Sequence, residues 1–271
     1  MFKLLKKGPV EYLASSALGQ CDALVHAFCT RRGGITEGHF ASLNFSAREG
    51  DGSDRVRKNG EIIASAFNLH EDQFFSVHQV HGDRILIVDH KNIDSLKQQQ
   101  HQCDAIMTDQ PGLAIGIKTA DCVPVFLAAK TQRIIAVIHA GWRGTALNIS
   151  AKTVAAFAET FSCRPADMIA AIGPSIGPCC YQVDDAVFKA GGGNENWESA
   201  FLPGRKQGEW LLDLPSANKR QLIQAGIPWE SVFTADLCTS CRKDLFFSHR
   251  GEAGKTGRQI NFMMLKEKKS I

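Results

Sequence analysis

Five consecutive apolar residues, Ile134-Ile-Ala-Val-Ile138, are followed at once by the glycine-containing run His139-Ala-Gly-Trp-Arg-Gly-Thr145. A strand with one solvated face alternates apolar and polar residues, so this unbroken apolar run predicts a strand that is buried on both faces. The run after it leads into a helical pattern that extends to Phe161. We therefore expect a sheet that is covered on both sides, with His139 at the point where a buried strand ends and a helix begins.

The rest of the chain alternates between strand and helix patterns. Strands are expected at Phe74–Val80, Arg84–Val88, Ala105–Thr108, Leu113–Lys118, Val123–Leu127, Met168–Ile172, Val232–Ala235 and Gln259–Met264. Helices are expected at Ser53–Leu69, from Asp184 onward and at Pro215–Ala225. The first two strands are expected to meet in a hairpin-like corner at residues 81–83, whereas residues 91–102 and 197–210 are expected to be irregular. The sequence shows no repeat and no clear linker, so one domain over residues 1–271 is expected.

The composition excludes several classes of protein. The chain has 271 residues, of which 44% are apolar, and this is enough to build a sizeable buried core. Because 31 Lys and Arg residues oppose 28 Asp and Glu residues, the net charge of +3 argues against a disordered chain and against a strongly basic nucleic-acid binder. No apolar run approaches the roughly 18 residues that cross a membrane, and the first residues lack the pattern of a signal peptide. We expect a cytoplasmic protein that binds neither nucleic acid nor membrane.

The sequence contains nine cysteines, an odd number, and no secretion signal, so a disulfide framework is not expected. Most of these residues are expected to be buried thiols. Cys238-Thr-Ser-Cys241 has the spacing of half a zinc ribbon or of a redox pair, but no second pair with this spacing exists. Cys179-Cys180 is expected to be packed in a loop, because a disulfide between adjacent residues is strained. The role of Cys238 and Cys241 stays open at this point.

His81, Cys122 and His139 each lie at a predicted junction between a strand and a turn. Two histidines and one cysteine would leave the fourth tetrahedral position of a zinc ion open, as in catalytic zinc sites. The alternative for each histidine alone is a hydrogen-bonded residue in a turn. His78 lies three residues before His81, and in a continuous strand the two would point to opposite faces. Asp121 is a candidate base or a partner of the metal ligands, although an Asp in such a bend also bonds nearby backbone N–H groups.

Gly141-Trp-Arg-Gly144 opens the helix that follows the buried strand, so backbone N–H groups are expected to face the same region as His139. Arg143 could bind a phosphate or carboxylate there through two parallel hydrogen bonds. The alternative is that Arg143 pairs with a surface carboxylate. Arg31 and Arg32 form a second basic loop beside two glycines, and we expect one of them to be solvated and the other functional.

Six motifs occur together in the order in which one known family has them. They are Phe28-Cys-Thr-Arg-Arg-Gly-Gly, Ser42-Leu-Asn-Phe, His78-Gln-Val-His-Gly82, Thr119-Ala-Asp-Cys-Val-Pro124, His139-Ala-Gly-Trp-Arg-Gly144 and Ile172-Gly-Pro-Ser-Ile-Gly-Pro-Cys. On these motifs the chain resembles the laccase-domain family, which is also called the polyphenol oxidase family and, more recently, purine nucleoside phosphorylase with adenosine deaminase activity. The resemblance extends over residues 23–265, which is nearly the whole chain.

The resemblance implies a single-domain, mixed α/β fold. Its expected form is an α/β/β/α sandwich similar to that of the cytotoxic-necrotizing-factor cysteine hydrolases. The resemblance also implies a zinc site, with copper as the less favoured metal, and its ligands map onto the residues selected above: His81, Cys122 and His139. In addition, it implies that three further residues approach the substrate: Arg31, Ser42 and Asn44.

The implied activity is phosphorolysis of adenosine or inosine, in which inorganic phosphate attacks C1′ of the ribose and the purine leaves. S-methyl-5′-thioadenosine is a further implied substrate. Deamination would require a water molecule, activated by the metal, to attack C6 of the purine, with Asp121 or His78 as acid or base. The expected partners are therefore a purine nucleoside and inorganic phosphate, and a homodimer is left open.

Three other functions are also left open. If Cys122 is a thiolate nucleophile and His139 its base, the protein would be a hydrolase of amide bonds, in line with the peptidoglycan-precursor editing role attached to bacterial members of the family. A copper-dependent polyphenol oxidase is less favoured, because one His/Cys/His set cannot build the several copper sites that four-electron reduction of oxygen requires. The third alternative is a zinc-stabilised interaction module, which Cys122→Ala would unfold.

Overall fold

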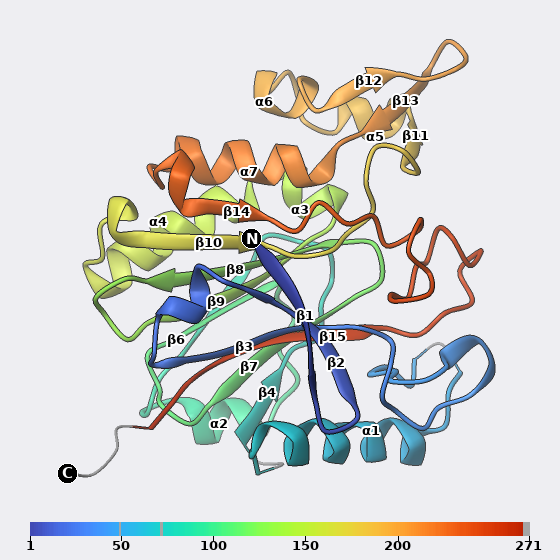
Figure 1. Ribbon diagram of the computed structural model, residues 1–271. Helices are drawn as coiled ribbons and strands as arrows, with labels where there is room; N and C mark the ends of the chain where they lie inside the picture. Colours follow the sequence, from blue (N-terminus) through green and yellow to red (C-terminus); the bar gives the residue numbers. More distant parts are fainter. Residues whose placement is uncertain (49, 71–72, 268–271) are drawn as a thin grey trace.

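Among residues 1–48, 50–70 and 73–267, which the computed structural model describes, two six-stranded sheets lie face to face (Figure 1). The N-terminal sheet has the strands, in spatial order, β1 (Phe2–Lys7), β2 (Val10–Ser15), β3 (Leu24–Cys29), β15 (Gln259–Leu265), β7 (Ala114–Thr119) and β4 (Phe74–Ser76). The central sheet has β14 (Val232–Thr234), β10 (Met168–Ile172), β8 (Val123–Ala129), β9 (Ile135–Ala140), β6 (Ala105–Thr108) and β5 (Ile85–Val88). The N-terminal sheet is antiparallel except for a parallel pair at one edge, β7 with β4, whereas the central sheet has a parallel pair at each edge, β10 with β14 and β6 with β5.

The remaining elements are helices and one small sheet. The small sheet consists of β11 (Gln182–Asp184), β13 (Glu209–Leu212) and β12 (Phe201–Pro203). The α-helices are α1 (Ser53–Phe67), α2 (Ile93–Lys97), α3 (Trp142–Ala146), α4 (Ile149–Phe161), α5 (Asp185–Lys189), α6 (Glu195–Glu198) and α7 (Leu214–Gln224). Short 3-10 helices lie at Leu18–Gln20, Gly38–Phe40, Pro165–Asp167 and Trp229–Ser231. Within the described residues, no helix has both the length and the apolar composition to cross a membrane.

Helices cover the outer faces of both large sheets, so the layers follow the order helix, sheet, sheet, helix (Figure 1). Between the two sheets, Phe28 of β3 stacks on Phe126 of β8 with ring centroids 4.0 Å apart. On the outer side of the central sheet, Phe157 of α4 is buried in a second core. On the outer side of the N-terminal sheet, Phe67 of α1 packs edge-on against Phe262 of β15. The mixed α/β fold expected from the sequence is confirmed.

Strand β9 is buried at every position, as its unbroken apolar pattern predicts. Full burial of each Ile or Val contributes about 1.5–3 kcal/mol, so the middle of the central sheet is strongly fixed. β8 runs antiparallel to β9, with Pro124 opposite His139 and Val123 opposite Ala140. The start of β8 and the end of β9 therefore lie at the same end of the sheet, and this end carries the site described below.

The hairpin-like corner expected at residues 81–83 is wrong. β4 pairs in parallel with β7 in the N-terminal sheet, whereas β5 pairs in parallel with β6 in the central sheet. The chain therefore crosses from one sheet to the other between these two strands. Both pairing partners lie later in the sequence, and so the local pattern of residues 74–88 cannot reveal them.

Several boundaries also differ from expectation. The strand expected at Phe74–Val80 ends at Ser76, and the irregular segments 91–102 and 197–210 contain α2 and the strands β12 and β13. The helix expected to run to Phe161 is interrupted after Ala146, where Asn148 adopts a left-handed backbone with φ of 61°. Three-residue strands such as β12 depend on pairing with a neighbour more than on intrinsic propensity, and this is why the sequence did not reveal them.

Candidate active site

The structure brings His81, Cys122 and His139 together. His81 lies between β4 and β5, Cys122 directly precedes β8, and His139 is on β9. One potential ligand atom of each side chain lies within 4.8 Å of those of the other two. His81 reaches this position with φ of 61°, a left-handed conformation that is uncommon outside glycine and that recurs at functional sites. The three residues selected from the sequence thus form one cluster.

Asp104, which the sequence analysis did not select, orients both histidines. This fully buried carboxylate pairs through Oδ1 with Nδ1 of His139 at 2.8 Å and accepts the backbone N–H of His81 at 2.9 Å. Its Oδ2 accepts the N–H groups of Gly82 at 2.8 Å and Val80 at 3.2 Å. Because Nδ1 of His139 is engaged with Asp104, Nε2 is left to bind a metal ion, and such a carboxylate–histidine pair is typical of metal sites.

The electrostatics of the cluster favour a thiolate on Cys122. Burial opposes its ionisation, but the imidazoles of His139 and His81 outweigh burial and lower the pKa of Cys122 to about 6. Burial likewise opposes a charge on His139, yet Cys122 and Asp104 raise the pKa of His139 to about 9. The thiolate is the form of cysteine that binds metal ions and that acts as a nucleophile.

Gly141 makes room for the cluster. A Cβ at this position would lie 2.9 Å from Cδ2 of His81 and 3.1 Å from Sγ of Cys122. The backbone of Gly141 has φ of −72°, which every residue can adopt. Glycine is therefore required here for space, because any side chain would press on two of the three clustered residues.

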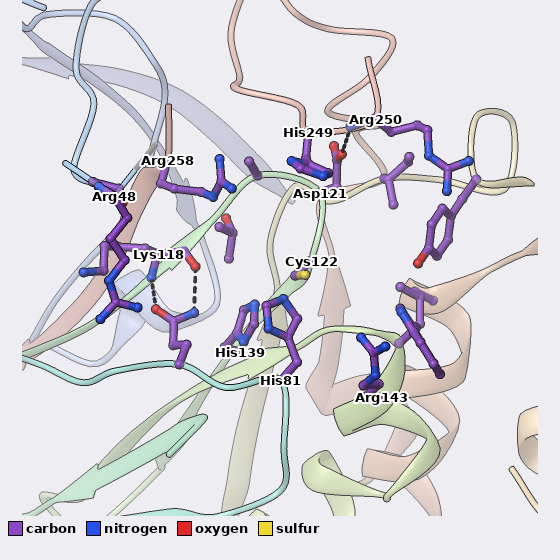
Figure 2. Close-up of a pocket in the computed structure, with 18 of the residues that line it drawn as sticks. Arg48, His81, Lys118, Asp121, Cys122, His139, Arg143, His249, Arg250 and Arg258 are labelled. Carbon is purple, nitrogen blue, oxygen red and sulfur yellow. Dashed lines mark hydrogen bonds between the residues drawn. The ribbon is translucent and has the colours of Figure 1, made fainter. Parts of the chain in front are cut away.

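A pocket of about 450 Å³ opens over the cluster. Small-molecule sites in proteins have volumes of roughly 300–1,000 Å³, so the pocket is of suitable size for a ligand. The basic residues of its described lining are Arg48, Lys118, Arg143, Arg250 and Arg258. Figure 2 shows Arg48, Lys118 and Arg258 on one side of Cys122 and Arg143 and Arg250 on the other. The pocket is thus suited to an anionic ligand or to a ligand with an anionic group.

Arg143 is held by an aromatic contact. Its guanidinium lies 4.2 Å from the ring centroid of Trp142, and both residues line the pocket. Among the described residues Arg143 forms no ion pair, so the surface carboxylate that was its alternative partner is not found there. The helix that the two residues open, α3, has only five residues. The positive charge on this side of the pocket therefore comes from the guanidinium groups of Arg143 and Arg250, and not from the end of a long helix.

Asp121 precedes Cys122 in the chain and joins two distant loops to the site. Its Oδ1 accepts hydrogen bonds from Oγ1 of Thr239 at 2.6 Å and from Oγ of Ser248 at 2.7 Å. Its Oδ2 accepts the backbone N–H of Arg250 at 2.6 Å (Figure 2). Three donors thus occupy this buried carboxylate, which holds the loops against the start of β8.

Arg31, Ser42 and Asn44 are not among the described residues that line the pocket. The guanidinium of Arg31 pairs with Glu252 at 3.0 Å, and Oγ of Ser42 accepts two backbone N–H groups of the same loop. Asn44 is fully buried, and its Oδ1 accepts the backbone N–H of Arg258 at 2.8 Å. Because Arg258 lines the pocket, Asn44 lies directly behind its wall, whereas the bonds of Arg31 and Ser42 go to residues outside the described lining.

His78 is not among the described lining residues either, whereas its neighbours Val77 and Gln79 are. This alternation is typical of an extended segment and places His78 and Gln79 on opposite faces. The side-chain amide of Gln79 forms hydrogen bonds of 2.7 and 2.8 Å with the backbone of Lys118 (Figure 2). These bonds attach the segment before His81 to the end of β7.

The clustered side chains could hold one metal ion. Zinc binds imidazole nitrogen at about 2.0 Å and thiolate sulfur at about 2.3 Å, so the donors of a tetrahedral site are separated by about 3.3–3.6 Å. The separations here are at most 4.8 Å, and small rotations of the side chains would close the difference. Three protein donors leave one tetrahedral position, and the pocket gives a ligand access to it. The donor set and the Asp104–His139 pair both fit a catalytic metal.

The protein thus has a mixed α/β fold, with two sheets between helical layers. It also has a candidate metal centre, because the His/Cys/His cluster lies at the end of the central sheet under a basic pocket. The model of the family described as multi-copper polyphenol oxidoreductase laccase matches residues 25–266. The chain belongs to this family, which agrees with the resemblance seen in its motifs.

Individual relatives are similar over nearly the whole chain. The purine nucleoside phosphorylase YlmD of Geobacillus stearothermophilus is 36% identical over 249 residues, which are 90% of each chain. Its namesake in Bacillus subtilis is 32% identical over 248 residues, covering 90% of this chain and 89% of that one. The crystal structure of the Bacillus licheniformis hypothetical protein YfiH superposes with a TM-score of 0.89 at 34% identity, covering 98% of this chain and 99% of that one.

Proposed function

We propose that this protein is a zinc-dependent purine nucleoside phosphorylase that also deaminates adenosine. The observation that carries the proposal is that His81, Cys122 and His139 share one pocket with a group of basic side chains. A phosphorylase must hold inorganic phosphate beside a neutral nucleoside, and this pocket combines positive charge with a suitable volume. The names of the relatives at 36% and 32% identity support the same activity. S-methyl-5′-thioadenosine is included among the proposed substrates.

Arg143 is proposed as the main phosphate ligand. Its guanidinium can donate two parallel hydrogen bonds to phosphate oxygens, and the ring of Trp142 limits its orientations. Arg250 lies on the same side of Cys122 and is held in turn, because its guanidinium lies 5.1 Å from the ring centroid of Tyr181 and donates to the carbonyl of Gln182. Each well-placed electrostatic contact of this kind is worth about 3 kcal/mol in the transition state.

In the proposed phosphorolysis, a phosphate oxygen forms a bond to C1′ as the bond from C1′ to the purine nitrogen breaks. The bonding electrons leave with the purine, which takes up a proton, and the products are ribose 1-phosphate and free base. The protein contributes mainly by fixing phosphate and nucleoside in line for this displacement. Basic groups on both sides of the cluster would stabilise the charge that develops on the two ends.

A bound zinc ion would supply Lewis acidity, which polarises an oxygen of the substrate or of water. Among the chain's own residues, Asp104 keeps Nε2 of His139 available to the metal and fixes the backbone of His81. We propose that Asp121 acts by positioning, because its carboxylate is occupied by three donors. Proton transfer in deamination is not assigned to His78, which lies outside the described lining.

Arg31, Ser42 and Asn44 are proposed to support the substrate side of the pocket. Asn44 is the clearest case, because its amide donates to the carbonyl of Ser46 at 2.7 Å and accepts the N–H of Arg258 at 2.8 Å. Both of these partners line the pocket. A change at Asn44 would therefore shift two lining residues at once.

The assay for this function follows each product separately. Adenosine and inosine are incubated with the zinc-loaded protein, with and without phosphate, and ribose 1-phosphate, inosine and free base are quantified. Formation of ribose 1-phosphate only when phosphate is present supports phosphorolysis, and conversion of adenosine to inosine without phosphate supports deamination. If neither nucleoside yields any product, the proposed function is rejected.

A cysteine hydrolase is the second candidate, and one observation favours it. Cys122, His139 and Asp104 form a chain of thiol, imidazole and carboxylate in which the pKa of Cys122 is lowered, as in enzymes with a cysteine nucleophile. Its substrates would be amides, including peptidoglycan precursors. Metal content separates the two candidates: a zinc ion held by Cys122 in the active protein supports the phosphorylase, whereas covalent trapping of Cys122 in metal-free, active protein supports the hydrolase.

We also propose a cytoplasmic location. All nine cysteines are free thiols, although several of their sulfur atoms lie close together. Free thiols persist in reducing compartments such as the cytoplasm. Isolation of the protein from cell fractions with its thiols unmodified would support this placement, and recovery from an oxidising compartment would contradict it.

A further inference from the structure

Four cysteines outside the pocket converge from two parts of the chain. Cys179 and Cys180 follow β10, and Cys238 and Cys241 follow β14. Their Sγ atoms all lie within 4.8 Å of one another. Sγ of Cys241 is 3.6 Å from that of Cys179 and 3.4 Å from that of Cys180, and all four residues are free thiols. Cys179 and Cys180 thus supply the second pair of cysteines that a zinc site would need beside Cys238 and Cys241.

The backbone holds the two cysteine pairs against each other. Ser175 and Cys238 form a parallel bridge, in which the N–H of Ser175 donates to Leu237 at 3.2 Å and the N–H of Thr239 donates to Ser175 at 3.0 Å. The N–H of Gly177 points to Sγ of Cys238 at 3.3 Å. Such N–H donors stabilise a thiolate. The convergence of the four sulfur atoms is therefore fixed by main-chain hydrogen bonds.

The spacing of the sulfur atoms matches that of a tetrahedral metal site. With zinc–sulfur bonds of about 2.3 Å, sulfur atoms at the corners of a tetrahedron are about 3.8 Å apart. The contacts of 3.4 and 3.6 Å and the upper limit of 4.8 Å bracket this value. A disulfide would require about 2.05 Å between two sulfur atoms, and the contacts of 3.4 and 3.6 Å are well beyond this length.

We propose that Cys179, Cys180, Cys238 and Cys241 bind a second zinc ion in a closed, four-thiolate site. Four protein ligands leave no position for water or substrate, so this ion has a structural role. Its ligands differ from the residues of the His81–Cys122–His139 cluster. The inference therefore stands or falls independently of the proposed enzymatic function.

The position of this site gives it a specific structural task. Thr239, between Cys238 and Cys241, donates to the carboxylate of Asp121 at 2.6 Å. Tyr181, directly after Cys180, lines the pocket. A zinc ion that joins the two cysteine pairs would hold both of these residues in place. The second zinc site is thus expected to keep one wall of the pocket rigid.

Metal content per chain tests the proposal. Full-length protein is purified under reducing conditions and its zinc is measured by elemental analysis. The wild type is expected to hold about two ions, and the Cys238→Ser/Cys241→Ser and Cys122→Ala variants about one each. Cys163→Ser, which removes a buried thiol outside both clusters, is expected to retain the wild-type content. A Cys122→Ala variant that is folded and holds no zinc would overturn the proposal.

A second measurement covers the case in which the double variant does not fold. Cobalt is loaded into the Cys122→Ala variant, whose only remaining proposed metal site is the four-cysteine cluster. Strong thiolate-to-cobalt charge-transfer absorption with the visible bands of tetrahedral cobalt supports four-thiolate coordination. Absence of these bands, or a disulfide among the four cysteines in protein isolated under reducing conditions, contradicts it.

Amide hydrogen exchange tests whether the second zinc site keeps the pocket wall rigid. In the folded Cys241→Ser variant, amide hydrogen exchange of residues 174–182 and 237–242 is expected to rise at least tenfold, while exchange in β9 stays unchanged. A second readout rests on the proposed phosphorylase activity: the KM for nucleoside is expected to rise more than kcat falls, since the pocket wall and not the ligand cluster is loosened. Unchanged exchange in both segments would refute this role.

Discussion

Replacement of Asp104 by Asn probes the site without changing a proposed metal ligand. The two side chains have nearly the same shape, but Asn presents an NH2 group where Asp presents a second oxygen. If this NH2 group takes the place of Oδ1, it faces Nδ1 of His139 and the N–H of His81. If it takes the place of Oδ2, it faces the N–H groups of Gly82 and Val80. In either orientation, the two groups that faced the replaced oxygen lose their acceptor; of the four, Nδ1 of His139 is buried and the backbone N–H groups of Val80, His81 and Gly82 are partly buried.

An unpaired buried donor costs about 1–3 kcal/mol, and because the backbone N–H groups involved are only partly buried, the metal-free variant is expected to lose about 1–3 kcal/mol of unfolding free energy in total. Loss of a carboxylate partner of a metal-bound histidine lowers metal affinity about 10–100-fold, or about 1.4–2.7 kcal/mol. Urea unfolding measures the first quantity, and competition with a chromogenic chelator measures the second. Asp167→Asn, at a surface ion pair with Arg164, is the control and is expected to change neither. A folded Asp104→Asn protein with wild-type zinc affinity would refute this reasoning.

Three further changes test other parts of the structure. Gly141→Ala is expected to lower zinc affinity at least tenfold in chelator competition, because the added methyl group would press on two ligands. Arg143→Ala is expected to raise the KM for phosphate about 10–100-fold, as loss of a charged hydrogen bond costs about 1.5–3 kcal/mol, with less effect on the KM for nucleoside in initial-rate assays. His26→Gln is expected to remove a pH dependence of stability. Burial lowers the pKa of His26 to about 4, so the wild type should lose roughly 3 kcal/mol between pH 6.5 and 4 in urea unfolding.

The sign of the His26 effect follows from proton counting. Unfolded His26 binds a proton below about pH 6.5, whereas the folded residue accepts the N–H of Ser15 at 2.9 Å and stays neutral down to about pH 4. Stability is therefore complete above pH 6.5 and falls as the pH falls through this window. His90→Gln, at an exposed histidine, should keep the wild-type slope. The His26 assignment fails if His26→Gln keeps it as well.

The other two changes also have matched controls. Gly52→Ala adds a methyl group that meets nothing within 4 Å, and Arg164→Ala removes an exposed arginine far from the pocket in sequence. Both variants are expected to behave as wild type in the respective assays. Equal zinc affinity in Gly141→Ala and Gly52→Ala would show that the close approach at Gly141 is not needed. Equal phosphate KM in Arg143→Ala and Arg164→Ala would remove Arg143 from the phosphate site.

The sequence reveals the three clustered residues, His81, Cys122 and His139, better than it reveals the residues that hold them in place. Cys122 and His139 stand next to buried apolar runs, and antiparallel pairing of β8 and β9 brings such positions to one end of a sheet. Asp104 precedes a predicted strand in the same way, but its role depends on which strand lies beside β6. A signal existed nonetheless: a metal-bound histidine needs an acceptor for its second nitrogen, and Asp104 stands at the start of a buried strand pattern.

Residues that meet only through the tertiary fold could not be predicted. Arg48, Arg250 and Arg258 come from loops far apart in the chain, and no periodic pattern marks them as lining one pocket. The two cysteine pairs are a similar case, since they meet through the bridge between Ser175 and Cys238. The local patterns define strands that are apolar throughout, whereas loops gain their positions from contacts with distant partners.

The contacts that hold the candidate site differ between its two sides: the side toward the central sheet, which lies behind the cluster, and the side toward the pocket wall, which lies in front of it. Behind the cluster, Asp104 is completely buried at the start of β6 and fixes the ligands through short hydrogen bonds. In front of it, Asp121 and the four-cysteine cluster hold loops that form the pocket wall. Changes behind the cluster should therefore act first on metal affinity, and changes in front of it on substrate KM. This division follows because the buried sheet positions the reacting centre, while the loops of the pocket wall are held by a few hydrogen bonds to distant parts of the chain.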